Sequence, residues 1–159
     1  MADFESREKW NAERIHALAI YCSDGRWGEA FDDLCHRGLK IPRYDRFAVP
    51  GGPLWLSRRH ISLLWSFDAA RLHLSFLVEA HALKRIVLIT HHGCAYYGNL
   101  LGADADACMG AQEHDLGVAA SILGGWFPLL RIEGYIGTQV GEGFAFRAAP
   151  LTAASGRGT

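Results

Sequence analysis

The stretch RIVLITHHGC, residues 85–94, decides the fold of this chain. Its first six residues, RIVLIT, predict a strand: the five that follow Arg85 form an unbroken β-branched and aliphatic run, which is typical of a strand covered on both faces of a parallel sheet. Shorter apolar runs at residues 14–21 and 44–49 predict two further strands. The second of these stops at the sequence PGGP, residues 50–53, which breaks any regular element.

Segments with helical apolar spacing separate and follow these strands. We predict helices over residues 27–38, 57–83 (with Ser57 as its N-cap) and 107–123, a loop at 95–106, and strands at 129–136 and 144–148. Alternation of strands and helices favours right-handed crossovers between parallel strands. We therefore expect an α/β fold, with a central, mostly parallel sheet of about four parallel strands plus an antiparallel edge strand, flanked by helices.

The length and composition indicate a single domain. The chain has 159 residues, of which 50% are hydrophobic. We expect a single α/β domain at residues 14–150, preceded by an N-terminal arm or short helix (1–13) and followed by a disordered tail (151–159). The net charge is −1 without blocks of like charge, so no nucleic-acid partner is expected. No signal-peptide pattern occurs and charged residues interrupt the apolar stretch 61–83, which predicts a cytoplasmic protein without a membrane partner.

Four cysteines are present, and metal binding or burial is favoured over disulfides in a chain without an export signal. Cys35 and Cys108 fall on apolar helix faces and are expected to be core residues. Cys22, Cys94 and His91 instead follow predicted strands. Ligands of parallel sheets sit at the carboxyl ends of the strands, so the two loops converge if their strands are neighbours.

Two thiolates and one imidazole favour zinc over calcium or magnesium, which prefer oxygen ligands. We therefore predict that Cys22, His91 and Cys94 hold Zn²⁺. Three protein ligands leave a fourth position for water in a catalytic site, or for a side chain in a closed one. Asp24 is the candidate to occupy or control that position, and Arg26 can pair with it and fix its orientation.

The sequence CSDGR, residues 22–26, resembles the CxDxR signature of the β-class carbonic anhydrases, and residues 91–94 resemble their HxxC motif. Residues 132–148 resemble the closing strand–turn–strand of that family. The resemblance implies that Cys22, His91 and Cys94 are zinc ligands and that Asp24 and Arg26 form the catalytic dyad. It also implies a carbonic anhydrase-like lyase that hydrates CO2 reversibly to bicarbonate through a zinc-bound hydroxide.

The family resemblance further implies a homodimer or a dimer-based higher oligomer. His92, beside a predicted ligand, is a candidate proton shuttle. Gly51, Gly52 and Tyr96 are candidate substrate-binding residues, because glycine lets backbone N–H groups approach a ligand closely.

The chain departs from the family pattern at three places. AYY follows Cys94 at residues 95–97, where the two tyrosines could narrow the pocket. PGGP at residues 50–53 replaces an Arg-Asn-Ala-Gly type of loop, and Glu13 stands where many members have a substrate-binding glutamine. Two alternatives therefore remain open: hydrolysis of a CO2 analogue (carbonyl sulfide or carbon disulfide), and a non-catalytic zinc- or anion-binding protein.

Overall fold

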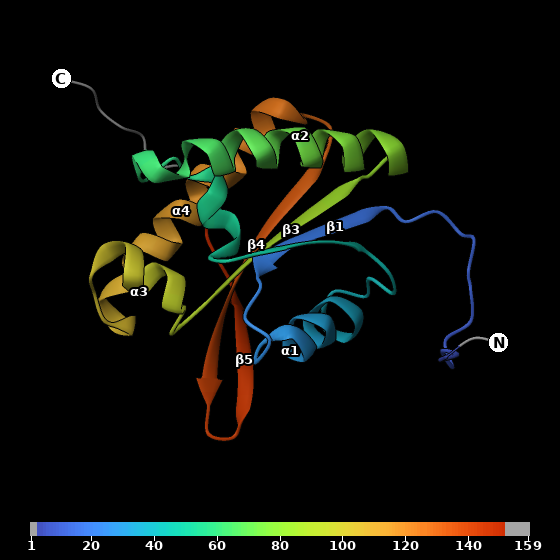
Figure 1. Cartoon of the computed structure of the whole chain (residues 1–159), viewed down its shortest axis with the longest axis horizontal. Coiled ribbons are helices and arrows are strands. Elements are labelled where there is room, and N and C mark those ends of the chain that lie inside the picture. Colours follow the sequence, from blue (N-terminus) through green and yellow to red (C-terminus); the bar gives the residue numbers. More distant parts are fainter. Residues whose placement is uncertain (1–2, 152–159) are drawn as a thin grey trace.

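A five-stranded sheet forms the centre of the computed structural model, which describes residues 3–151 (Figure 1). Its strands are β1 (Ala17–Cys22), β2 (Asp45–Val49), β3 (Arg85–His91), β4 (Arg131–Val140) and β5 (Gly143–Ala148). The order across the sheet is β2-β1-β3-β4-β5, in which the first four strands run parallel and β5 pairs antiparallel with β4. The predicted fold class is confirmed.

Helices cover both faces of this sheet. They are α1 (Gly28–Asp33), continued by a π-helical turn (Leu34–Gly38), α2 (Leu64–His81), α3 (Ala95–Leu101) and α4 (Ala105–Trp126), with short 3-10 helices at Gly52–Leu56 and Ile61–Leu63. Figure 1 shows α1 on one side of the sheet and α2 and α4 on the other. In a right-handed crossover, the direction of the step along the sheet sets the face on which the connecting helix lies. The step from β1 to β2 runs in one direction, and the steps from β2 to β3 and from β3 to β4 run in the other.

Alternate residues of the two central strands build two core layers. Towards α2 and α4 point Leu18, Ile20, Ile86 and Leu88. Towards α1 point Ala19, Val87 and Ile89. All of β1 is buried, as is β3 after its first residue. Coverage on both faces explains why these strands are apolar without alternation.

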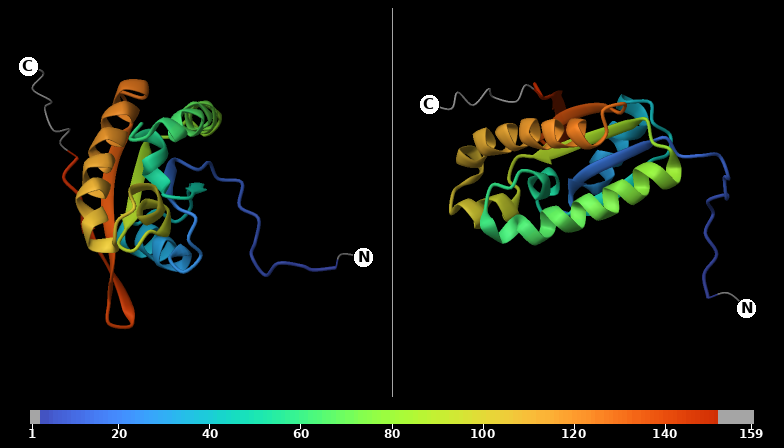
Figure 2. Two further views of the ribbon diagram at one scale, coloured as in Figure 1. Left: turned by 60° about the vertical axis from the view of Figure 1, so that its left-hand side comes forward. Right: turned by 90° about the horizontal axis from the view of Figure 1, so that it is seen from above.

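Two segments project from this body (Figure 2). Residues 3–13 form neither a helix nor a strand, and they extend away from the sheet. The β4–β5 hairpin extends past the ends of the other strands, and Gly141 in its turn has a φ of +59°, which favours glycine. Apart from Leu151, the predicted tail at 151–159 lies outside the described residues.

The predicted start of the long helix is wrong. The α2 helix begins at Leu64, because the backbone of Arg58 has a φ of +53° and so cannot continue a helix from Ser57. The Ser57 hydroxyl instead donates to the carbonyl of Leu54, and His60 caps the 3-10 turn by accepting from the N–H of Ser62.

The predicted loop at residues 95–106 is also wrong in part, since it contains α3. A seven-residue helix has too few turns for an apolar period to be visible in the sequence. Packing of the buried Tyr97 ring holds α3 in place.

The α2 helix presents apolar residues on two faces. Its inner face buries Phe67, Ala70 and Leu74. Its outer face exposes apolar side chains at 68–86%, namely Ile61 (in the preceding 3-10 turn), Trp65, Leu72 and Phe76. By length and composition, the helical stretch Ile61–His81 is apolar enough to cross a membrane, and 22% of its most apolar window is buried. The outer face therefore gathers several exposed apolar side chains along one helix of the described residues.

Candidate metal centre

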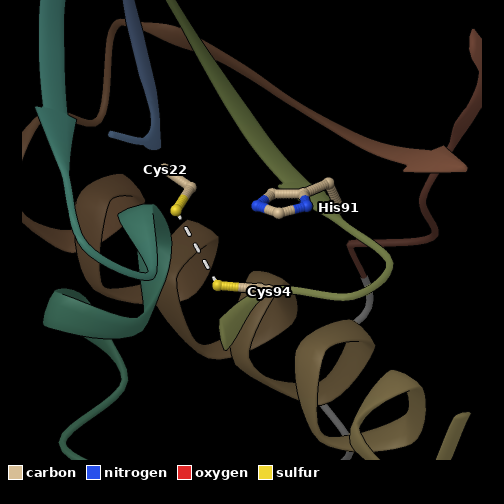
Figure 3. A group of neighbouring side chains, drawn as sticks. All are labelled: Cys22, His91 and Cys94. Atoms are coloured by element: carbon tan, nitrogen blue, oxygen red, sulfur yellow. Dashed lines mark hydrogen bonds between the residues drawn. The ribbon is translucent and has the colours of Figure 1, made fainter. Parts of the chain in front are cut away.

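The carboxyl ends of β1 and β3 bring two cysteines and a histidine together. The two strands are parallel neighbours that end at Cys22 and His91. Cys94 follows after a turn in which Gly93 has a φ of +72°. One ligand atom from each of Cys22, His91 and Cys94 lies within 4.8 Å of the other two, and all three residues are buried (Figure 3). The structure thus assembles the three predicted ligand residues into one group.

The spacing of the sulfur atoms fits a zinc ion. The Sγ atoms of Cys22 and Cys94 are 3.7 Å apart. A tetrahedral zinc with Zn–S bonds of about 2.3 Å places its two sulfurs about 3.8 Å apart. The two thiols therefore stand at the separation that a shared zinc ion requires.

The His91 ring is prepared to act as a ligand through one nitrogen. Its Nδ1 lies 2.9 Å from the carbonyl oxygen of His92, and because a carbonyl can only accept, Nδ1 carries the proton. The other nitrogen, Nε2, is buried and has no hydrogen-bond partner among the described residues. A buried polar atom without a partner is rare, and a metal ion would satisfy this one. Donation from the second ring nitrogen to a carbonyl is the usual support of a metal-bound histidine.

The two thiols share a proton. The pKa of Cys22 is lowered, mainly because Cys94 hydrogen-bonds to its sulfur, and the pKa of Cys94 is raised because it holds that proton against the Cys22 thiolate. Backbone N–H groups add support: that of Gly51 lies 3.4 Å from Cys22 Sγ. One thiolate is thus easily formed, and the second needs the positive charge of a cation beside it.

The Asp24 carboxylate lies outside the ligand group and is held by Arg26. The Arg26 guanidinium donates from Nη2 to Oδ2 at 2.6 Å and from Nε to Oδ1 at 3.0 Å, and the Arg26 backbone N–H donates to Oδ1 at 3.1 Å. These bonds lower the pKa of Asp24 to about 2. Asp24 is therefore ionised and fixed in direction, two residues from a candidate ligand.

Of the glycines predicted to bind substrate, Gly52 is packed against β1 and Gly51 against the side chains of Tyr96 and Leu54. Gly51 and Gly52 have φ values of +76° and +53°. A Cβ added to Gly52 would lie 2.7 Å from the carbonyl carbon of Tyr21, and one added to Gly51 would lie 2.9 Å from the ring of Tyr96. Close approach to the cluster therefore explains both glycines, and Tyr96 covers the turn that they form.

His92 lies beside the ligand group in a small cleft. Its Nε2 pairs with the Asp106 carboxylate at 2.9 Å. The cleft has a volume of about 320 Å³ and is lined by Arg26, Trp27, His92, Gly93, Gln139 and Phe144. The Trp27 ring also packs on the His91 ring, with centroids 4.6 Å apart. His92 and Arg26 therefore face the same opening, which reaches the candidate ligands only through Trp27, the ring packed on His91.

The sequence interpretation missed the support that α4 supplies. Gln112 is 1% exposed, and its Nε2 donates to the His91 carbonyl at 2.8 Å. The sequence does contain a pattern that places Gln112 on the buried face of the helix. Gln112 precedes Leu116, Ala119 and Leu123 at helical spacing. A polar residue on an apolar helix face indicates a specific buried partner.

Asp115 is a second buried polar residue of α4. It is 1% exposed. Its carboxylate accepts from Arg59 at 2.7 and 2.8 Å and from the Tyr97 hydroxyl at 3.0 Å. This buried network ties α3, which follows Cys94, to α4 and to the segment before α2.

Comparisons with known proteins concern the fold. No protein-family model matches the chain, and no curated protein sequence is similar to it. Among solved structures, the chain is similar to the wild-type β-carbonic anhydrase CafD of the filamentous fungus Aspergillus fumigatus, with a TM-score of 0.51 and 13% identity over 85% of this chain and 90% of that one. The chain therefore has a fold similar to that of a β-carbonic anhydrase, with a Cys/His/Cys group that could hold a metal ion at the carboxyl ends of its central strands.

Proposed function

We propose that this chain is a zinc-dependent, carbonic anhydrase-like lyase that converts CO2 and water reversibly to bicarbonate. The observation that carries the proposal is the arrangement at the end of β1. Cys22 belongs to the three-residue ligand group, whereas Asp24 is held outside it by Arg26. Structural zinc sites are usually closed by four side chains and need no oriented carboxylate, whereas catalytic sites keep one position open.

The proposed ligand atoms are the Sγ atoms of Cys22 and Cys94 and Nε2 of His91. Zinc held there would lower the pKa of water to about 7 and so supply a nucleophile at neutral pH. Gln112 keeps the end of β3 in position through the His91 carbonyl. The Gly51 N–H stabilises negative charge on the Cys22 sulfur.

The proposed role of Asp24 is to orient the attacking water. Because its pKa is about 2, the carboxylate remains an acceptor at neutral pH. It would accept a hydrogen bond from that water and direct an oxygen lone pair towards the carbon of CO2. Arg26 holds the carboxylate in that direction and keeps it from moving onto the metal.

His92 is the proposed proton acceptor. It lines the same cleft as Arg26, and its Nε2 donates to Asp106, which leaves Nδ1 free to take a proton. The proton released as water adds to CO2 would pass through this ring to buffer.

Stopped-flow CO2 hydration tests the proposal, on protein of measured zinc content across roughly pH 6.5 to 9. We expect turnover with about one zinc per chain. The variant Asp24→Ala should keep its zinc and lose turnover by about 100-fold or more. Asp33→Ala is the matched control, because Asp33 pairs with Arg37 on the exposed side of α1.

Three outcomes would contradict parts of the proposal. Full activity in Asp24→Ala would reject the dyad. Protein with a full zinc content that turns over only carbonyl sulfide or carbon disulfide would mean that the substrate is a sulfur analogue of CO2. The aromatic side chains of Trp27 and Phe144, which line the cleft, would accommodate such a substrate. Full zinc with no turnover on any of the three would make the site non-catalytic.

We propose that the partner of this chain is a second copy, bound through the outer face of α2. An antiparallel contact about a two-fold axis near residues 68 and 69 sets Trp65 against the partner's Leu72. Self-complementary apolar positions support a two-fold dimer.

Light scattering coupled to size-exclusion chromatography tests this contact. We expect a dimer that becomes a monomer in Trp65→Glu, since Trp65 is 86% exposed and its replacement puts a charge at the interface. Leu129→Glu is the matched control, because Leu129 is 94% exposed outside α2. A monomeric parent chain, or a dimer that survives Trp65→Glu, would overturn the contact, and binding of the parent chain to phospholipid vesicles would assign the face to a membrane.

A further inference from the structure

A basic pocket lies at the end of the sheet opposite the candidate metal centre. Its volume is about 640 Å³, within the range of ligand pockets. Five of the sixteen lysine and arginine residues of the chain line it, against the single carboxylate of Glu13. They are Arg14, Lys40, Arg43, Lys84 and Arg85. β1 and β3 begin here and end at the ligand group, roughly 17 Å away for a six-residue strand.

The positive charge of this pocket is only partly balanced. Arg85 pairs with Glu133, which does not line the pocket. Arg43 is held by the backbone carbonyls of Asn11 and Glu13, at 2.8 and 2.6 Å, and it also pairs with the Glu13 carboxylate at 3.8 Å. Lys84, Lys40 and Arg14 form no ion pair among the described residues. Three cationic side chains of the pocket are therefore available to an anion.

The floor of the pocket is apolar and preformed. Ala17 and Ile41 are 5% and 6% exposed, and Pro42 stands beside them. The backbone N–H groups of Lys84 and Arg85 both donate to the carbonyl of His16, which fixes the wall made by the start of β3. A bound molecule would thus meet a rigid apolar surface, which reduces the cost of binding.

The backbone conformation of Lys40 is a second indication that this pocket binds an anion. Its φ is +57°, a conformation that costs energy for a residue with a side chain. Glycine would avoid that cost, and Gly38 stands only two residues earlier. The strained backbone places a lysine side chain on the rim of the pocket.

We propose that this pocket binds an organic anion that carries an acidic head group on an apolar body, such as an aromatic or acyl carboxylate. The unpaired cations recognise the head group, and the floor of Ala17, Ile41 and Pro42 receives the apolar body. A hydrated inorganic anion would use the cations alone. This site is separate from the metal group and does not depend on the proposed function.

Protein-observed NMR titration of the full chain tests the proposal with three probes. Benzoate carries both features, benzyl alcohol lacks the charge, and inorganic phosphate lacks the apolar body. We expect benzoate to shift the amide signals at the starts of β1 and β3 and of residues 40–43, with a Kd of about 1 mM. The other two probes should bind at least about fivefold more weakly.

Variants at one lysine decide whether the pocket is responsible. The Lys84 side chain is exposed, and the hydrogen bonds of its backbone remain in any variant, so Lys84→Glu should fold normally. We expect Lys84→Glu to weaken benzoate binding about tenfold. Lys9→Glu makes the same change of charge outside the pocket and should leave it unchanged.

The proposal is overturned by any of four results. These are no saturable benzoate binding below about 20 mM, equal affinity for phosphate, equal affinity in Lys84→Glu and the parent chain, or shifts confined to the outer face of α2. Because binding is measured without turnover, failure here would leave the lyase proposal untouched, and failure of the lyase proposal would leave this one untouched.

Discussion

Two pairs of cysteines in this molecule are equally buried but have different neighbours. Cys22 and Cys94 are 7% and 5% exposed, and Cys35 and Cys108 are 0% and 3% exposed. Cys22 and Cys94 hydrogen-bond to each other beside an unpartnered histidine nitrogen. Cys35 lies in an apolar cluster, where burial raises its pKa to about 11. The comparison teaches that the polar groups around a buried thiol, rather than its burial, separate a candidate ligand from a core residue.

Truncation of one cysteine from each pair should give the largest difference. Cys94→Ala removes a proposed ligand, so we expect zinc affinity to fall by more than about 100-fold, beyond the usual effect of a group that only supports a ligand. Cys108→Ala is the matched control, because Cys108 lies in the same apolar cluster as Cys94 but outside the ligand group. The zinc content per chain after dialysis against a weak chelator measures the effect. Equal zinc content in both variants would contradict the distinction between candidate ligand and core cysteines.

Loss of a supporting hydrogen bond should have an intermediate effect. Gln112→Leu keeps the volume of the side chain but removes the donor to the His91 carbonyl, so we expect zinc affinity to fall by about 10- to 100-fold. Competition with a fluorescent zinc chelator measures the affinity. His114→Leu is the control, since His114 lies on the same helix but is exposed. An unchanged affinity in Gln112→Leu would show that the end of β3 holds His91 without help from α4.

Cys35 should give the smallest effect, and one that depends on pH. Its pKa is about 11 in the folded chain against 9.0 as the reference value, so the folded state retains a proton that the unfolded state loses between these values. The Cys35 contribution to the free energy of unfolding is complete below pH 9.0 and falls by about 1.4 kcal/mol per pH unit from there to about pH 11.

Urea unfolding at a series of alkaline pH values measures this slope. We expect Cys35→Ala to lose stability less steeply than the parent chain over that interval. The variant also loses packing, so the comparison rests on the slope and not on the absolute stability. Parallel slopes would mean that Cys35 titrates no differently from an exposed thiol.

Much of the fold could be predicted because the central strands are continuous apolar runs that can be recognised in the sequence. The run at residues 85–90 predicts a central strand, and the break at 50–53 marks the end of β2 and the start of the crossover to β3. The start of α2 could not be predicted, since a left-handed backbone at Arg58 is imposed by contacts far along the chain, including the pairing of Arg59 with Asp115. The short α3 was missed for a similar reason, because a tertiary contact of Tyr97 stabilises it.

The candidate site likewise combines features that the sequence predicts with features that only the tertiary structure shows. The sequence by itself identified the three candidate ligand residues, because Cys22, His91 and Cys94 directly follow or end apolar strands, and it placed Asp24 and Arg26 close enough along the chain to pair locally. Only the tertiary structure decided that the sulfur atoms stand 3.7 Å apart and that His91 Nε2 has no hydrogen-bond partner within residues 3–151. It also decided that Gln112 and Asp115 are buried beneath the site. Distances and burial between segments far apart in sequence depend on how β1, β3 and α4 pack together, and no local pattern of residues encodes that packing.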